Sequence, residues 1–330
     1  MHPYITAPTA TQKEASMIEA KGLTKIYGDR TAVDHVTFTV QAGRVTGFLG
    51  PNGAGKSTTM RMIMGLDRPT SGTVTVNGVP FAQHVAPLRE IGSLLDAKAV
   101  HTGRSAYNHL LAMGATHSIP RKRINEVIEM TGLAEVAGKK VKGFSLGMGQ
   151  RLGIAAALLG DPQTVILDEP VNGLDPEGVV WVRNLAKYLA SEGRTVFLSS
   201  HLMSEMAVTA DHLIVIGRGK IIADAPIQEI ITGKGLSRAR VRTDQPEHLV
   251  NLLAGDDVSV QVQEPELLEI TGLDPRHIAR IALENRVMIY ELTPLQPSLE
   301  EAYMELTKDE VEYHSLITTG AAASVQAGGN

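Results

Sequence analysis

The chain has 330 residues, a formal net charge of −5, 43% hydrophobic residues and 20% charged residues. This balance supports a buried core and excludes wholesale disorder, and the length suits about two domains. The acidic balance and an aromatic content of only 4% argue against a dedicated nucleic-acid binder, and the absence of cysteine excludes disulfides and thiolate metal sites.

The two ends of the chain are predicted to be tails. Residues 1–16 are polar and rich in Thr and Ala, without the basic and apolar segments of a secretory signal, and residues 316–330 are rich in Ala and Gly. No run approaches the roughly 18 apolar residues that a membrane-spanning helix needs. We therefore expect flexible tails and no span within this chain.

Residues 17–232 form the first predicted block. The apolar run Val45–Leu49 predicts a strand that leads into a Gly-rich turn and a helix. Similar runs at 164–167, 195–199 and 213–216 predict further strands of a buried parallel sheet. Alternating residues at 36–40 and 73–76 favour half-exposed antiparallel strands. Residues 87–160 show no clear strand and are predicted to form a helical subdomain.

Residues 233–315 form the second predicted block, a small α+β domain. Strands are expected at 241–243, 258–262, 267–270 and 287–292, with helices at 247–253 and 275–285. A last helix is expected to open at Ser298, because Glu301 follows three residues later in the pattern of a capping box.

The strongest chemical signal is the segment Gly50–Ser57, which matches the P-loop pattern G-x-x-x-x-G-K-[ST]. Its glycines let the backbone approach phosphate oxygens, and its amides and the following helix N-terminus form an anion cradle. Lys56 is predicted to reach the β- and γ-phosphates, and Ser57 to ligate Mg²⁺. The predicted ATP-binding residues here are Gly50, Pro51, Asn52, Gly53, Ala54, Gly55, Lys56, Ser57 and Thr58.

A carboxylate pair, Asp168 and Glu169, ends the apolar run Val165–Leu167. Alone, such a pair is typical of a solvated turn. Downstream of a P-loop it predicts a Walker B site, in which Asp168 holds Mg²⁺ and Glu169 polarises the attacking water.

With these motifs in order, residues 17–232 resemble the ATPase subunits of ABC transporters. Tyr27 precedes the P-loop where that family has an aromatic residue, and Phe144–Arg151 resembles the LSGGQ signature. Asn172–Pro176 resembles the D-loop, and His201 follows an apolar strand as the switch histidine does. The expected fold is α/β, a P-loop NTPase core of the ABC type with a helical and an antiparallel β subdomain, followed by the small α+β domain.

The resemblance implies a role for each of these residues. Tyr27 would stack on adenine, and Glu169 and His201 would act in hydrolysis. Ser145 and Gly147 of the signature, with Asp175 of the D-loop, would complete the site of an opposing subunit. The resemblance thus implies ATP and Mg²⁺, a head-to-tail homodimer and a separate membrane permease contacted near residues 97–119. The expected location is cytoplasmic, at the inner face of the cell membrane, and no nucleic-acid partner is expected.

The chain departs from the family pattern at two places. Leu146 and Met148 replace a Gly and the Gln of the signature, which puts the glutamine's contact in doubt. Asp96 stands where the family has the Q-loop glutamine. Asp96 is a candidate Mg²⁺ ligand, and the alternative is a solvated loop acid.

The kind of partner is a further question. The C-terminal layout, ending in Ser298–Tyr303, resembles drug-resistance and antibiotic-export ATPases of the daunorubicin type, which implies export of a drug, antibiotic or lipid-like compound. The alternatives are an ABC-type ATPase that acts on a ribosome or nucleic acid, and a nucleotide-binding scaffold without hydrolysis. The transported compound is not readable from this chain, because selectivity resides in the permease.

Overall fold

The computed structural model describes residues 17–232, 237–255, 258–295 and 298–307. The predicted tails, 1–16 and 316–330, lie outside the described residues. Within the described part of the chain, no helix combines the length and apolar character needed to cross a bilayer.

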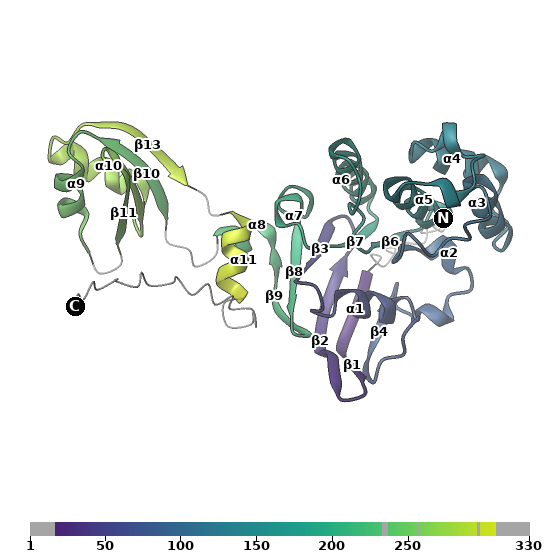
Figure 1. Cartoon of the computed structure of the whole chain (residues 1–330). Coiled ribbons are helices and arrows are strands. Elements are labelled where there is room, and N and C mark those ends of the chain that lie inside the picture. The colour runs from purple at the N-terminus through teal and green to yellow at the C-terminus, as the bar shows by residue number, and fades with distance from the viewer. Residues whose placement is uncertain (1–16, 233–236, 256–257, 296–297, 308–330) are drawn as a thin grey trace, which may run out of the picture.

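A six-stranded sheet forms the centre of the larger lobe (Figure 1). Five of its strands run parallel and the last pairs antiparallel with its neighbour. Both faces of the parallel strands are buried, which is why they read as continuous apolar runs. In spatial order the strands are β5 (Ile91–Leu94), β6 (Thr164–Leu167), β7 (Thr195–Ser200), β3 (Val45–Leu49), β8 (His212–Gly217) and β9 (Lys220–Pro226).

A three-stranded antiparallel sheet packs beside it, in the order β2 (Arg30–Gln41), β1 (Met17–Tyr27) and β4 (Ser71–Val76). The aromatic rings of Phe38, Phe48 and Phe197 join the two sheets, with centroids 5.2 to 5.9 Å apart. Helix α1 (Lys56–Ile63) contributes Met60 and Ile63 to the same core. Burial of these apolar side chains fixes β3, and hence the turn after it, against a rigid support.

The middle segment is largely helical, but the expectation that it contains no strand is wrong. Residues 91–94 form β5, which pairs parallel with β6. The strand has only four residues, two of them Gly92 and Ser93, so its apolar signal is weak. The helical elements are α2 (Pro87–Glu90), α3 (Ala106–Ala115), α4 (Arg121–Met130) and α5 (Leu146–Leu158), with short 3₁₀ turns η1 (Phe81–Gln83), η2 (Ala134–Val136) and η3 (Val141–Gly143).

Three more helices complete the larger lobe: α6 (Pro176–Ser191), α7 (Met203–Thr209) and α8 (Ile227–Thr232). Helix α7 follows β7 after two residues, and α6 contacts both α7 and β7. The two helices therefore pack next to β7 and to each other.

The smaller lobe is built from a β-α-β-β-α-β sequence (Figure 1). Its four antiparallel strands lie in the order β11 (Ser259–Glu264), β12 (Leu267–Thr271), β10 (Arg238–Thr243) and β13 (Ile289–Leu295). Helices α9 (Pro246–Leu253) and α10 (Pro275–Glu284) share a core with the sheet, centred on Val241, Leu268 and Ile278. This is the ferredoxin-like arrangement.

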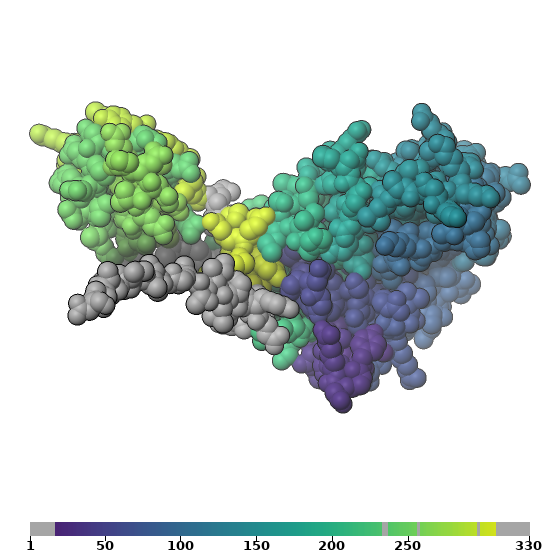
Figure 2. All heavy atoms as spheres, viewed as in Figure 1, coloured from purple at the N-terminus to yellow at the C-terminus, as the bar shows by residue number. Residues whose placement is uncertain are grey.

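The last described helix, α11 (Leu299–Thr307), begins with the expected capping box. The Glu301 amide donates to the Ser298 hydroxyl at 3.1 Å, and the Ser298 amide donates to the Glu301 carboxylate at 3.0 Å. Sequence analysis groups this helix with the second block. In the structure it packs against α7 and α8, and its buried Leu299 and Tyr303 belong to the core of the larger lobe. Figure 2 shows α11 in yellow between the two lobes.

Candidate nucleotide-binding and hydrolysis site

The turn after β3 has a backbone that only glycine accommodates at its key position. Gly55 has φ +109°, and a Cβ there would lie 2.6 Å from the Ala32 carbonyl oxygen. Gly53 has φ +83°, and a Cβ there would meet only the Arg30 guanidinium, at 3.8 Å, so its exposed side faces open space. The loop thus wraps closely at Gly55 and leaves room outside Gly53, which fits a phosphate cradle.

Lys56 is the first residue of α1 and is 6% exposed. Its Nζ donates to the Gly50 carbonyl at 2.7 Å and the Pro51 carbonyl at 3.4 Å, and lies 3.6 Å from a Glu169 carboxylate oxygen. The ammonium group therefore points into the loop at the N-terminus of α1, where a phosphate would find both its charge and the helix dipole.

A cleft of about 440 Å³ opens beside the loop, a size within the range of small-ligand sites. It gathers predicted residues from three separate segments, together with Arg30 and Ala32. Its lining residues are Tyr27, Arg30, Ala32, Pro51, Asn52, Gly53, Gly55, Lys56, Ser57, Thr58 and Glu169. Arg30 carries a cation that sequence reasoning missed, because it begins β2 with no motif to mark it.

Tyr27 is held at the cleft by an ordered polar contact. Its hydroxyl donates to Asp67 at 2.8 Å, and Asp67 also accepts from Arg61 at 2.8 Å. Chiefly because of the Arg61 hydrogen bond, the pKa of Asp67 falls from 3.8 to about 2. The hydrogen bond to Asp67 is also the main reason that the pKa of Tyr27 is raised. The half-exposed ring is thus oriented without being buried, as a stacking platform requires.

The carboxylate pair lies at the carboxyl end of β6. Glu169 is placed between two cationic or polar groups: its carboxylate contacts His201 Nδ1 at 2.8 Å and Lys56 Nζ at 3.6 Å. Asp168 instead accepts a short hydrogen bond of 2.5 Å from the Ser199 hydroxyl. The structure therefore brings Lys56, Glu169 and His201 together and gives the two acids different surroundings.

Two polar residues that sequence analysis gave no role contact Glu169. The buried Ser199 hydroxyl accepts from the Glu169 amide at 2.9 Å, and Gln150 donates its side-chain amide to the Glu169 carbonyl at 3.2 Å. Ser199 lies in β7, two residues before His201, and Gln150 lies within Phe144–Arg151, in α5, but no spacing rule singles them out.

The signature and D-loop residues lie apart from this cleft and do not line it. Ser145 caps α5 by accepting from the Met148 amide at 3.2 Å, and Asp175 caps α6 by accepting from the Gly178 amide at 2.9 Å. The two motifs contact each other, since a Cβ on Gly147 would lie 3.0 Å from the Gly173 carbonyl oxygen. Their predicted binding roles stay predictions, and within one chain they do not complete the cleft.

The donor set suits magnesium rather than an all-protein metal site. No group of three or more His, Asp or Glu able to hold a metal occurs among the described residues. Mg²⁺ ordinarily takes one or two protein oxygens and completes its shell with phosphates and water. The predicted ligands Ser57 and Asp168 carry oxygens of this kind, and their role stays a prediction. Asp96 is exposed and accepts from the Lys98 amide at 2.8 Å, so its carboxylate is engaged in its own turn. Its role as a ligand stays a prediction.

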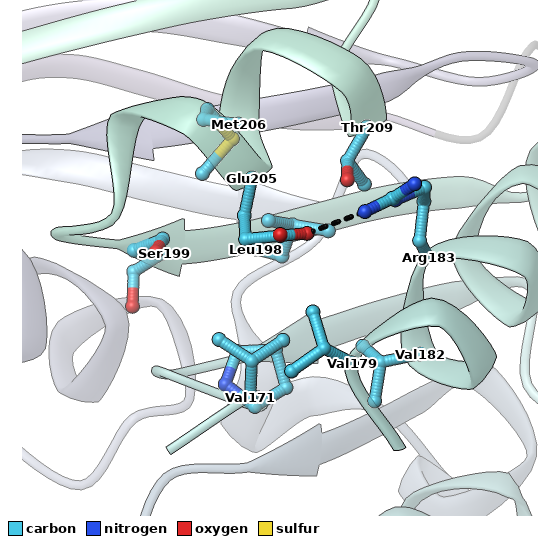
Figure 3. A pocket seen from close by; sticks show the side chains of 11 residues that line it. Val171, Val179, Val182, Arg183, Leu198, Ser199, Glu205, Met206 and Thr209 are labelled. Carbon is cyan, nitrogen blue, oxygen red and sulfur yellow. Dashed lines mark hydrogen bonds and ion pairs between the residues drawn. The ribbon is translucent and has the colours of Figure 1, made fainter. Parts of the chain in front are cut away.

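A small apolar cavity lies behind the site, between β7, α6 and α7 (Figure 3). It has room for about one water, about 20 Å³, and an ion pair crosses its rim from Arg183 Nη2 to Glu205 Oε2 at 2.8 Å. The pair ties α6, which begins after Asp175, to α7, which follows His201. Its lining includes Val171, Val179, Val182, Leu198 and Met206.

The chain is similar to known proteins over most of its length. Residues 33–172 match the family model described as ABC transporter, and 237–300 match a domain of unknown function. An uncharacterized ABC transporter ATP-binding protein, YhcH of Bacillus subtilis (strain 168), is 34% identical over 90% of this chain and 99% of its own. The bacitracin transport ATP-binding protein BcrA of Bacillus licheniformis is 36% identical over 88% of this chain and 97% of its own.

The fold is similar to a solved structure of an ATP-binding subunit of an ABC transporter. The TM-score is 0.60 at 25% identity, over 65% of this chain and 91% of that one. A P-loop cleft with a Walker B acid and a facing histidine, on this sheet, defines a P-loop ATPase. The chain belongs to the ABC transporter family, as one of its ATP-binding proteins.

Proposed function

We propose that this chain is the ATP-hydrolysing subunit of an ABC exporter that acts with a separate membrane permease. The observation that carries the proposal is the placement of Glu169, between Lys56 and His201 at the P-loop cleft. A carboxylate there can orient a water toward a phosphate held by Lys56, while His201 holds the carboxylate and can contact the same phosphate.

The nucleotide would be held by the residues that line the cleft. Tyr27 would stack on the base, and the loop from Gly50 to Thr58 would hold the phosphates. Ser57 and Asp168 would hold Mg²⁺, which when bound neutralises charge on the phosphates. Lys56 now contacts loop carbonyls, and a phosphate would offer it a full negative charge instead.

Export of a drug, antibiotic or lipid-like compound is supported by the similarity to BcrA, named for bacitracin transport. That similarity covers 88% of this chain and so extends beyond the ATPase block into the C-terminal lobe. The compound itself would be selected by the permease.

The permease would dock on a groove between the ATPase core and the helical segment. The groove measures about 590 Å³ and is mainly apolar, and its lining includes Leu66, Phe81, Leu88, Met113 and His117. It includes part of the segment 97–119 that sequence analysis assigns to this contact. With its permease the chain would lie at the cytoplasmic face of the membrane.

Hydrolysis is tested by steady-state ATPase assays of the wild type and Glu169→Gln. The variant should retain nucleotide binding and lose at least about 100-fold in kcat, because the carboxylate acts only on the attacking water. Equal rates for the two proteins would contradict the role of Glu169, and no wild-type hydrolysis in any membrane context would contradict the function.

Partner docking is tested by co-purification from detergent-solubilised membranes. Leu66→Glu places a charge in the groove at a residue that is 59% exposed, and Leu283→Glu is the matched control on the smaller lobe, at 80% exposed. The groove variant should lose the permease and keep its soluble ATPase rate, whereas the control should keep both. Retention of an integral membrane partner by Leu66→Glu would place the docking surface elsewhere.

A further inference from the structure

Glu169 has an unusual backbone conformation for a residue with a side chain. Its φ of +49° lies in the left-handed region, which costs free energy and persists only where the surroundings impose it. Both peptide groups that flank its Cα are held by side chains. Ser199 accepts from its amide at 2.9 Å, and Gln150 donates to its carbonyl at 3.2 Å.

The Ser199 hydroxyl contacts both acids at once. A hydroxyl has a single proton, and because its oxygen accepts from the Glu169 amide, that proton is free to go to Asp168, at 2.5 Å. Ser199 is fully buried at the end of β7, next to Leu198 (Figure 3), so water does not compete for either bond. One side chain thus sets the direction of Asp168 and the backbone of Glu169.

We propose that Ser199 is a positioning residue that keeps the two acids in separate roles, an inference that rests on the proposed ATPase function. Its hydrogen bond to Asp168 orients that carboxylate to coordinate Mg²⁺. Its bond to the Glu169 amide, together with Gln150, holds the left-handed turn that brings the Glu169 carboxylate to His201 and Lys56. Because Pro170 follows, Glu169 favours the extended region. Without the hydroxyl, Glu169 can relax toward that region, and its carboxylate then moves away from the position needed to orient the attacking water.

Loss of the Ser199 contact and loss of the Gln150 contact should have different effects. Ser199 is hydrogen-bonded to both Asp168 and Glu169, whereas the hydrogen bond that Gln150 donates goes to Glu169. Removal of the Ser199 hydroxyl should therefore weaken both hydrolysis and the metal response, and removal of the Gln150 amide should weaken hydrolysis alone. A purely structural role for either residue predicts no such division.

The experiment uses the full-length protein with Ser199→Ala, Ser199→Thr and Gln150→Met. The control is Thr46→Val in the neighbouring strand β3, which removes a buried hydroxyl that has no hydrogen-bond partner among the described residues. Three quantities are measured for each protein: kcat and KM for ATP, the affinity for a fluorescent ATP analogue in EDTA, and the Mg²⁺ concentration that gives half of the Mg²⁺-dependent gain in that affinity.

Ser199→Ala should lower kcat by about 10- to 100-fold and raise the half-effective Mg²⁺ concentration several-fold, the usual range for loss of a group that orients a ligand. Its affinity in EDTA should stay within about twofold, and Ser199→Thr should recover most of kcat because it restores the hydroxyl. Gln150→Met should lower kcat with an unchanged Mg²⁺ response. Thr46→Val should match the wild type.

Three results would overturn the proposal: an unchanged kcat in Ser199→Ala, no recovery by Ser199→Thr, or an equal loss of affinity in EDTA. If Ser199→Ala does not fold, the Gln150→Met division between kcat and Mg²⁺ response decides the matter. If the wild type does not hydrolyse ATP, the proposed function fails, and the Mg²⁺ response of Ser199→Ala still tests the contact with Asp168 independently.

Discussion

The three polar groups beside the cleft, Tyr27, Asp67 and Arg61, form a chain in which each orients the next. The Tyr27 hydroxyl donates to Asp67, and Asp67 is held ionised by Arg61. The ring is therefore fixed by charge rather than by burial, so its orientation depends on the ionisation of one carboxyl.

This arrangement predicts the pH range in which Asp67 contributes to stability. Its pKa of about 2 in the folded protein lies below the usual 3.8, so the unfolded chain binds more protons between these values and stability rises with pH there. The contribution should be complete above about pH 4 and lost as the pH falls toward 2. NMR titration of the side-chain carboxyl carbons should find the Asp67 midpoint near 2, and Arg61→Gln should raise it. A midpoint near 3.8 in the wild type would contradict the assignment.

At the scale of elements, α5 and β5 approach closely through a glycine. A Cβ on Gly92 would lie 1.9 Å from the Ala157 carbonyl oxygen, a contact that requires the helix backbone to move. The strand that precedes Asp96 therefore depends on the absence of one side chain.

We expect Gly92→Ala to destabilise the larger lobe by about 3 kcal/mol, the upper end of the usual cost of overpacking. Gly138→Ala is the matched control, because a Cβ there meets nothing within 4 Å and its φ is not positive. Urea unfolding of both variants measures the difference. Equal midpoints would show that α5 can shift at little cost.

A second prediction concerns α11. Leu299 is 1% exposed and lies in the same core as Met206 of α7 and Ile227 of α8. Leu299→Ala should cost about 2–5 kcal/mol. Hydrogen exchange should accelerate in α7 and α8 and remain unchanged in β10 to β13. Met304→Ala, at a residue 64% exposed on the same helix, is the control. Faster exchange confined to the smaller lobe would assign the helix to that lobe instead.

Features that depend on neighbours in the sequence were predicted correctly, whereas features that depend on contacts between distant segments were missed. Local patterns predicted the P-loop turn, the buried strand before Asp168 and the capping box at Ser298, because each depends on neighbours a few residues away. The strand at 91–94 was missed because parallel pairing with β6, not its own composition, makes it a strand. Ser199 and Gln150 were missed as contacts because they meet Glu169 across 30 and 19 residues of chain. The packing of α11 on α7 and α8 likewise depends on tertiary contacts.

At the scale of the whole molecule, the predicted nucleotide-binding residues lie in two separate places on the chain. The cleft holds the P-loop, Tyr27 and Glu169, whereas Ser145 and Gly147 lie outside its lining. If the signature serves the cleft of a second copy, each dimer has two sites and each chain contributes a different half to each of them.

This division predicts complementation between two inactive variants. Lys56→Ala removes the phosphate contact of one half-site, and Ser145→Arg blocks the signature of the other. Each variant alone should be inactive, but an equal mixture should recover about a quarter of the wild-type rate, because half of the dimers are mixed and each mixed dimer has one intact site. Steady-state ATPase assays across mixing ratios test this, and no recovery at any ratio would contradict shared sites.

Because α8 ends at Thr232 and α11 begins at Leu299, both on the larger lobe, the smaller lobe is connected to its neighbour at both of its ends. A lobe on one tether can swing and twist in every direction. A lobe attached at two points is constrained to rotate mainly about the line that joins its two attachments. A force applied to the smaller lobe would therefore reach the larger one as tension on α8 and α11, two helices that contact each other, α11 also contacting α7.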